Sequence, residues 1–382
     1  MITLIIEWLT MKIDIFCKII DNYGDIGFSW RLANDLANNY DCIVRLIVDN
    51  LTTFSSINSK INSNSNYQII DNIQILNWNS DDVLKIKPAE LIIETFNCNI
   101  PDEYIQKITE NISCWLNIEY LTAEPWIENC HLLPSKISKN SNKFFFFPGF
   151  NNKTGGLILE PNLIKERNIF QKSLASQLFF LKTLGIDANL LEKRSSKFFC
   201  YMFCYNTTPI VDIIKGFEKL NKEIVVLANL GNPILKFAKY YNNKKVKIIE
   251  IPFIDQNDFD KLLWCMDINF VRGEDSFIRA IWSGRPMIWN IYQQEDNAHI
   301  NKLDCWVDVY NPPSYVKKLI YSWNKNNSNL LIKSIQESFS GPNWIKWQKH
   351  AKNWSDNQSQ QSSLSYRLLK FCTKYFKKDK IL

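Results

Sequence analysis

The sequence predicts an α/β protein made of two parallel-sheet domains that face each other across a cleft. Two series of alternating segments, typical of strands and amphipathic helices, occupy the two halves of the chain. A helical segment predicted at 162–184 connects the two series. With 382 residues the chain is also longer than one hydrophobic core ordinarily serves. Because strands that alternate with helices are typical of parallel sheets, we expect one such sheet in each half.

A glycine-containing turn near the middle of the chain, T-G-G at 154–156, separates the two series. Glycine is common where a chain passes between elements, so the turn predicts a Rossmann-like domain at 1–155 and a second one at 156–345. Glycine also lets the backbone approach a ligand closely, so the same turn is compatible with a binding loop. A polar, aromatic-rich helix with a basic tail is predicted for the remaining residues, 346–382.

The composition suits a globular protein and excludes several functional classes. Hydrophobic residues make up 46% and charged residues 22% of the chain, which provides apolar material for two cores. The net charge of +6 suits an anionic ligand, but no run of lysine and arginine is long enough to predict nucleic-acid binding. No apolar stretch reaches the roughly 18 uncharged residues of a membrane span. Residues 1–10 contain Glu7 and lack a basic flank, so they predict no signal peptide.

The ten cysteines and three histidines predict neither disulfides nor a metal site. No two cysteines have the C-x-x-C spacing, and most lie inside apolar runs, which is typical of reduced thiols in a cytoplasmic protein. Cys200 and Cys204, the closest pair, would need further ligands to hold zinc, whereas the histidines are scattered along the chain. We therefore expect a cytoplasmic protein without structural zinc.

The chain opens with a predicted strand at 12–20, the turn D-N-Y-G-D-I-G at 21–27 and a helix at 28–39. This opening resembles that of nucleotide-binding folds, but it lacks the G-x-G-x-x-G spacing of a dinucleotide site. Instead, two aspartates, Asp21 and Asp25, flank a glycine. In a crevice such a pair can act as base and orienting group or bind a cation. In an ordinary turn, Asp21 ends the strand and Asp25 caps the helix.

The later strands and helices continue this alternation. In the first half we predict strands at 42–48, 91–95, 114–118 and 144–147 and a long polar loop at 50–66. In the second half we predict strands at 198–205, 223–228, 246–251 and 268–271 and helices at 209–220, 234–241 and 258–266. Ligands of parallel sheets bind outside the carboxyl ends of the strands, so the turns that follow these strands are the candidate binding loops.

The turn R-G-E-D-S at 272–276 joins one of these strands to a helix predicted to end at Gly284. The amino terminus of a helix attracts anions, because its N–H groups and its dipole face the ligand. Arg272 can hold a phosphate as a two-pronged donor, while Asp275 and Ser276 are suited to cap the helix. A capped helix beside an ordinary surface arginine is the simpler interpretation of the same residues.

Aromatic side chains accompany the predicted strands of the second half. Phe203 and Tyr205 are two residues apart on one predicted strand, so both rings should point to the same face. Phe253 and Phe259 follow a later strand, with Gln256 between them. Rings with an amide between them suit a flat nucleobase, although aromatic residues in such positions also serve as core.

Together these motifs resemble a known family, the bacterial arginine rhamnosyltransferases that modify elongation factor P. The resemblance extends over nearly the whole chain from Met11, and its motifs are specific in combination rather than singly. It is carried by D-N-Y-G-D-I-G at 21–27, W-L-N-I-E-Y-L at 115–121, F-F-F-P-G-F at 145–150, T-G-G at 154–156, F-C-Y at 203–205, P-F-I-D-Q at 252–256, L-L-W-C-M-D-I-N-F-V-R-G-E-D-S-F at 262–277 and W-S-G-R-P at 282–286.

The resemblance implies a GT-B glycosyltransferase whose first domain binds the acceptor and whose second domain binds the nucleotide sugar. It implies transfer of rhamnose, with inversion, from dTDP-β-L-rhamnose to an arginine side chain of elongation factor P. A cofactor, a metal, a nucleic acid and a membrane are not expected to take part. Two alternatives are a sugar-nucleotide epimerase or hydrolase of GT-B architecture and a non-catalytic binder of elongation factor P.

The same resemblance assigns roles to individual residues. Asp21, Asp25 and Glu274 correspond to the active-site carboxylates of the family. The positions that correspond to nucleotide-sugar binding are Phe203, Tyr205, Phe253, Gln256, Phe259, Arg272, Asp275 and Ser276. The pattern F-C-Y also occurs at 199–201, so the alignment of Phe203 and Tyr205 has an alternative.

An arginine acceptor needs activation, because the pKa of a guanidinium exceeds about 12 and its lone pairs are delocalised. A carboxylate pair can hold the guanidinium, aim one nitrogen at the anomeric carbon and accept a proton as the C–N bond forms. We assign the base role to Asp25 and the orienting role to Asp21, with the reverse order as the alternative. Arg272 and the helix N–H groups would stabilise the departing diphosphate, and Glu274 would bind either a ribose hydroxyl or the acceptor.

Overall fold

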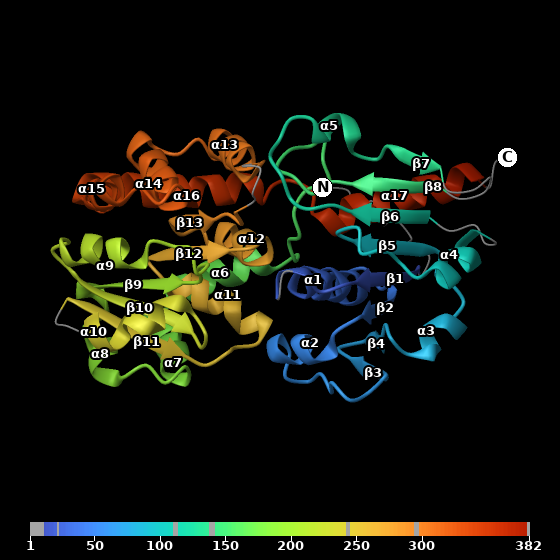
Figure 1. Cartoon of the computed structure of the whole chain (residues 1–382), viewed down its shortest axis with the longest axis horizontal. Coiled ribbons are helices and arrows are strands. Elements are labelled where there is room, and N and C mark those ends of the chain that lie inside the picture. Colours follow the sequence, from blue (N-terminus) through green and yellow to red (C-terminus); the bar gives the residue numbers. More distant parts are fainter. Residues whose placement is uncertain are drawn as a thin grey trace. The chain divides into compact units, whose positions relative to one another are not determined.

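The computed structural model describes residues 11–20, 23–109, 114–136, 142–241, 245–293 and 298–379, with side chains up to residue 375. The chain forms two compact units. One consists of residues 1–161 and 361–382, and the other of residues 162–360. Each unit contains its own sheet, built mainly from parallel strands with helices on its faces (Figure 1). The two parallel-sheet domains predicted from the sequence are thereby confirmed.

The first unit contains an eight-stranded sheet in the order β3-β4-β2-β1-β5-β6-β8-β7. Its strands pair in parallel except at the two edges, where β3 runs antiparallel to β4 and β7 antiparallel to β8. The elements of this unit are β1 Lys12–Cys17, α1 Gly24–Asn39, β2 Ile43–Val48, α2 Leu51–Ile57, β3 Tyr67–Ile70, β4 Ile73–Asn77, α3 Asp81–Lys85, β5 Leu91–Thr95, α4 Asp102–Thr109, β6 Cys114–Ile118, α5 Ile127–Cys130, β7 Pro134–Lys136, β8 Asn142–Phe146 and α17 Leu364–Asp379.

The central strands of this sheet are buried on both faces because helices cover both. Ile13 and Ile15 of β1 belong to one hydrophobic cluster, which also contains apolar residues of α1 and α17. Phe16, which points to the other face, belongs to a second cluster with Tyr104 of α4. The alternation along β1 therefore places the strand between two cores, as expected for a parallel sheet.

The second unit contains a five-stranded sheet in which every pairing is parallel, in the order β11-β10-β9-β12-β13. Its elements are α6 Leu163–Lys172, α7 Leu174–Thr183, α8 Ala188–Glu192, β9 Lys197–Met202, α9 Ile210–Glu218, β10 Glu223–Asn229, α10 Ala238–Tyr241, β11 Val246–Ile251, α11 Gln256–Cys265, β12 Ile268–Arg272, α12 Asp275–Ser283, β13 Met287–Asn290, α13 Ala298–Tyr310, α14 Ser314–Asn324, α15 Ser328–Ser338 and α16 Gly341–Gln358. Short 3₁₀ helices cover Arg194–Ser196 and Pro233–Phe237.

The predicted polar loop at 50–66 is wrong in its first half, which forms α2. The side chain of Asn50 accepts a hydrogen bond from the N–H of Thr53 at 2.9 Å and caps this helix. Leu51, Phe54 and Ile57 recur every three residues and are buried. The Ser, Thr and Asn residues between them suggest a loop by composition, but the apolar spacing and the cap decide the helix.

The end of the chain and the domain boundaries also differ from the prediction. Instead of one long helix there are two, and α16 belongs to the second unit whereas α17 belongs to the first. The boundary between the units lies at 161/162 rather than at 155/156. The connector predicted at 162–184 is likewise broken into α6 and α7 at Ser173, whose hydroxyl accepts a hydrogen bond from the N–H of Ser176 at 3.1 Å. Local caps therefore interrupt helices that hydrophobic periodicity alone would continue.

All ten cysteines lie in the described ranges, and none of them forms a disulfide. Within the same ranges, no helix combines the length and the apolar character needed to span a bilayer.

The glycines of the T-G-G turn serve packing inside the first unit. The N–H of Gly155 donates to the carbonyl of Phe147 at 2.6 Å, and a Cβ at this position would collide with the ring of Phe146. Gly156 has φ +73°, which favours glycine. Arg367 of α17 donates to the carbonyl of Thr154 at 2.7 Å, so the turn also fixes the last helix to this unit.

We expect the substitution Gly155→Ala to destabilise the protein by about 1 to 3 kcal/mol, because the added methyl group overpacks the contact with Phe146. Urea unfolding would measure this loss. Gly341→Ala is the matched control, since a Cβ there meets no atom within 4 Å. Equal stability of the two variants would contradict the packing role of Gly155.

His131 is a partly buried base that the fold keeps neutral. Its Nδ1 accepts a hydrogen bond from the N–H of Phe147 at 3.1 Å, and its ring lies edge-on to Phe146. Burial, with a smaller contribution from the charge of Arg367, lowers the pKa of His131 from 6.5 to about 4. Between these two values the unfolded chain binds more protons than the folded one, so the free energy of unfolding falls as the pH falls.

We expect His131 to cost roughly 1 to 3 kcal/mol of stability as the pH falls from 6.5 to about 4. His131→Asn keeps an acceptor for the N–H of Phe147 but does not titrate in this range. Urea unfolding at several pH values should therefore show a smaller loss in the variant than in the wild type. Parallel pH profiles would exclude the contribution of His131.

Candidate active site

The strand order of the second sheet reverses between β9 and β12, with β10 and β11 on one side and β13 on the other. In open parallel sheets, ligands bind at such a reversal, outside the carboxyl ends of the strands. Phe203 and Tyr205 follow β9, and Arg272 ends β12. The guanidinium carbon of Arg272 lies 4.4 Å from the ring centre of Phe203 and 4.5 Å from that of Tyr205. Residues that are far apart in the sequence therefore meet at the expected edge.

Phe203 and Tyr205 do not lie on the strand as predicted, because β9 ends at Met202. The loop that carries them is nevertheless held by backbone hydrogen bonds. The N–H of Phe203 donates to the carbonyl of Phe270 at 2.8 Å, and the N–H of Tyr205 donates to Oδ1 of Asn290 at 3.0 Å. Of the two F-C-Y alignments, the structure brings the rings at 203 and 205 against Arg272.

Arg272 combines a stacked guanidinium with an unsatisfied donor. Stacking on aromatic faces orients the planar group and suits arginine better than lysine. The Nε of Arg272 is buried and has no hydrogen-bond partner among the residues the structure describes. Buried donors are normally paired, so this N–H is suited to a ligand acceptor such as a phosphate oxygen.

The turn that follows Arg272 aims the amino terminus of α12 at the same region. Gly273 has φ +65°, and its carbonyl accepts a hydrogen bond from Nε1 of Trp289 at 3.2 Å. The N-cap residue is Glu274, whose side chain makes no capping hydrogen bond. The predicted caps are therefore wrong, since the hydroxyl of Ser276 donates instead to the carbonyl of Arg272. A helix terminus without a side-chain cap is suited to an anion.

The carboxylates of this turn bind side chains of neighbouring helices. Asp275 accepts a hydrogen bond from Nε2 of Gln256 at 3.2 Å, which joins the amino termini of α12 and α11. Glu274 forms an ion pair with Lys302 of α13 at 3.1 Å. These contacts place Gln256, Asp275 and Glu274 around one loop, and the binding role of the first two and the catalytic role of Glu274 stay predictions.

Phe253 and Phe259 are the two rings that the sequence predicts around a flat nucleobase. Phe253 precedes α11 and is 41% exposed. Phe259, on α11, packs edge-on against Tyr201 with ring centres 5.6 Å apart. This contact supports the core interpretation of Phe259, and the role of both rings in binding a nucleobase stays a prediction.

In the first unit, the strand order reverses between β1 and β5, and Asp25 lies just beyond β1 in the first turn of α1. Asp25 is 2% exposed. Its Oδ2 accepts a hydrogen bond from the N–H of Ile20 at 2.8 Å, so the carboxylate holds the segment that leaves β1. Asp49 does the same one residue earlier, since its Oδ1 accepts from the N–H of Ile19 at 2.9 Å. Asp21 lies outside the described residues.

Sequence reasoning missed several residues that shape these loops. Asn290 ends β13 and also accepts a hydrogen bond from the hydroxyl of Thr208 at 2.8 Å. Tyr292 lies edge-on to Tyr205 with ring centres 5.6 Å apart. The signal for Asn290, Trp289 and Lys302 was weak, because their contacts depend on the pairing of β12 with β13 rather than on a motif.

The described side chains do not gather into a metal-binding cluster. Within those residues, no group of three or more His, Cys, Asp and Glu side chains is arranged to hold an ion. Because Asp21 lies outside the description, the expected metal independence stays a prediction.

Comparison with known proteins identifies the family. Residues 13–373 match the model of a family described as "Elongation-Factor P (EF-P) rhamnosyltransferase EarP". The chain belongs to this family. A protein-arginine rhamnosyltransferase of Pseudomonas aeruginosa is 34% identical over 94% of this chain and 98% of its own length. A protein of the same name from Shewanella oneidensis is 33% identical over 94% of this chain and 97% of its own length. Another from Neisseria meningitidis is 31% identical over 95% of this chain and 97% of its own length.

Solved structures agree with this membership at the level of the fold. A structure described as the basis of "EarP-mediated arginine glycosylation of translation elongation factor EF-P" has a TM-score of 0.63 and 24% identity, and covers 95% of this chain and 99% of that one. A structure described as "TcCGT1 in complex with UDP" has a TM-score of 0.57 and 9% identity, and covers 97% of this chain and 100% of that one. The predicted family and the GT-B fold are therefore confirmed, and the chain is a glycosyltransferase.

We expect the protein to bind dTDP, and we expect Arg272→Ala to weaken that binding by about tenfold or more, because a charge-assisted contact is lost. Arg272→Lys should weaken it less, since the charge stays while the planar fork and the stacking are lost. Calorimetric titration with dTDP would measure both effects. Lys222→Ala is the control, because it removes a cation that lies 5.9 Å from the ring centre of Phe198, at the opposite edge of the sheet. Unchanged affinity in Arg272→Ala would refute the phosphate role.

Proposed function

We propose that the protein transfers rhamnose from dTDP-β-L-rhamnose to an arginine side chain of elongation factor P, with inversion at the anomeric carbon. The observation that carries this proposal is the family match over residues 13–373, together with the set of Arg272, Phe203 and Tyr205 at the reversal of the second sheet. Relatives that align over almost their whole lengths are named protein-arginine rhamnosyltransferases. Because the acceptor is a translation factor, we place the reaction in the cytoplasm.

The second unit would bind the nucleotide sugar. Arg272 offers a stacked guanidinium and a buried, unsatisfied Nε, and α12 offers an amino terminus without a side-chain cap. As the bond between the anomeric carbon and the diphosphate oxygen breaks, negative charge grows on that oxygen. Donors that are already in position stabilise this charge without reorganisation, which is the main source of rate in such sites.

The first unit would bind and activate the acceptor. The two carboxylates Asp21 and Asp25 would hold the guanidinium and take one proton from the attacking nitrogen, while the new C–N bond forms. The nitrogen attacks the face of the sugar opposite to the departing dTDP, so a single displacement inverts the configuration. Burial of Asp25 excludes water from around this proton transfer.

The decisive experiment combines the protein with dTDP-rhamnose and elongation factor P and determines the mass of the acceptor. A gain of one deoxyhexose on an arginine supports the proposal. Release of free sugar or of an epimer without a change in the acceptor would favour an epimerase or hydrolase. Complex formation without any turnover would favour a non-catalytic binder. Full activity in the presence of a chelator is expected, and its loss would contradict metal-independent transfer.

We expect Asp25→Asn to reduce transfer by roughly 10² to 10⁴-fold, because the amide cannot accept the proton. The amide oxygen can still accept the hydrogen bond from the N–H of Ile20, so the local fold should persist. Asp49→Asn is a matched control, since Asp49 makes the same kind of bond to the N–H of Ile19. Initial rates measured by mass spectrometry should fall only in the first variant. Full activity of Asp25→Asn would refute its role as base and leave that role to Asp21.

A further inference from the structure

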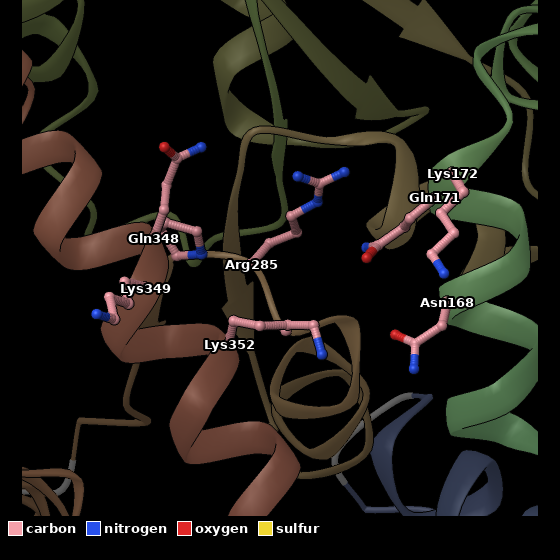
Figure 2. A pocket seen from close by; sticks show the side chains of 9 residues that line it. Asn168, Gln171, Lys172, Arg285, Gln348, Lys349 and Lys352 are labelled. Atoms are coloured by element: carbon pink, nitrogen blue, oxygen red, sulfur yellow. The ribbon is translucent and has the colours of Figure 1, made fainter.

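A basic cavity lies in the second unit, away from the residues that the proposed function uses. It has a volume of about 630 Å³ and is lined by residues of α6, of the turn between α12 and β13, and of α16. The lining residues are Asn168, Gln171, Lys172, Gly284, Arg285, Pro286, Gln348, Lys349 and Lys352. Figure 2 shows the ends of Lys172, Lys352 and Asn168 directed toward the same space, with Lys349 turned away.

This cavity lies at the edge of the sheet opposite to Arg272. Arg285 and Pro286 directly precede β13, whereas Arg272 ends the parallel strand β12. Helix α12 runs between the two edges, and its nine residues span roughly 13 Å at 1.5 Å per residue. The cavity is therefore distinct from the loops that carry Arg272, Glu274 and Asp275.

The lining contains four cationic side chains and no carboxylate. The neighbouring carboxylate of Asp356 is shared by two cations, Lys352 at 2.5 Å and Arg167 at 2.8 Å. Within the part of the chain that the structure describes, no ion pair joins Lys172, Arg285 or Lys349 to a carboxylate. Asp267, the acidic residue that acts on Arg285 through its charge, is itself paired with Arg194 at 2.9 Å. The cavity thus has an excess of positive charge.

Arg285 is the central feature of this cavity. Its Nη2 donates to the carbonyl of Trp264 at 3.3 Å, but its Nε is buried and has no hydrogen-bond partner among the described residues. Burial also lowers the pKa of Arg285. Arg285 forms no ion pair within the described residues, so an anion bound here would give this charge and its Nε a partner.

Some residues in and beside the cavity stabilise the fold through hydrogen bonds or packing, but others do not. Arg167 and Gln171 donate to the carbonyls of Trp282 and Ser283, and thereby satisfy the carboxyl end of α12. Gly284 has φ +63°, and a Cβ there would lie 3.1 Å from Cδ of Lys352, so the turn leaves room for this side chain. Among the residues that the structure describes, no contact accounts for the ammonium of Lys172 or for the Nε of Arg285.

We propose that this cavity binds a small molecule that carries several phosphate groups. Ammonium groups act as point charges toward phosphate, and the guanidinium and the amides of Asn168 and Gln348 add directional donors. The volume is in the range of small-molecule sites, and the open lining suits a hydrophilic ligand. Free polyphosphate and the phosphates of a nucleotide share this chemistry.

The test titrates the full-length protein, in the Arg272→Ala background, with tripolyphosphate and with ATP by calorimetry. Binding of tripolyphosphate should weaken about tenfold or more when Lys172→Gln and Lys352→Gln are added. The matched control is Lys215→Gln with Lys333→Gln, which removes the same charge from the exposed faces of α9 and α15. ATP that binds more tightly than tripolyphosphate would identify a nucleotide, and equal affinities would identify the phosphates alone.

Three outcomes would overturn the proposal. They are the absence of binding at millimolar tripolyphosphate, an equal loss in the control variant, and tighter binding of an acidic peptide than of tripolyphosphate. The single variant Lys172→Gln, which breaks no hydrogen bond within the described residues, keeps the test valid if the double variant is unstable. Because the readout is the difference between the cavity and control variants, it is independent of whether Arg272 binds the donor.

Discussion

The stacking of Arg272 on Phe203 and Tyr205 is the interaction around which the second unit is organised. It exists because β9 and β12 are neighbours in the sheet, although about 70 residues separate them in the sequence. The strand order also reverses between these two strands, which is where ligands of such sheets bind. Asn290 fixes the loop after β9, and Trp289 fixes the turn after β12. Both side chains come from β13, so the last strand of the sheet holds the two halves of the site in register.

The sheet of the first unit also has a reversal of strand order, but the side chain there has the opposite charge. There the strand order diverges between β1 and β5, and the side chain at the divergence is a carboxylate, Asp25, rather than a guanidinium. The hydroxyl of Ser29 donates to the carbonyl of Asp25 at 2.8 Å and links α1 to Thr95 at the end of β5. In the proposed reaction, the cation of the second unit would meet the leaving group, and the anion of the first unit would meet the cationic acceptor.

The sequence alone located those candidate residues and strands whose positions depend only on the order of residues along the chain. The strand-to-turn pattern located Asp25, Arg272 and Glu274, and β5, β6 and β11 were predicted with the bounds they have. The sequence alone could not predict side-chain contacts that depend on which strands pair. Lys302 reaches Glu274 only because α13 follows β13, and no local pattern encodes that approach. Helix α2 was not predicted because its composition is polar, although its apolar residues recur every three positions.

The failed prediction of the cap on α12 is the most informative one. Asp275 and Ser276 have the residue types of caps, yet Asp275 binds Gln256 and Ser276 donates to the carbonyl of Arg272. A capping side chain would occupy the N–H groups that an anion needs. Since both side chains are held elsewhere, the helix keeps its amino terminus open without leaving those polar groups unpaired. The departure from the local rule thus coincides with the place where the proposed reaction needs unoccupied donors.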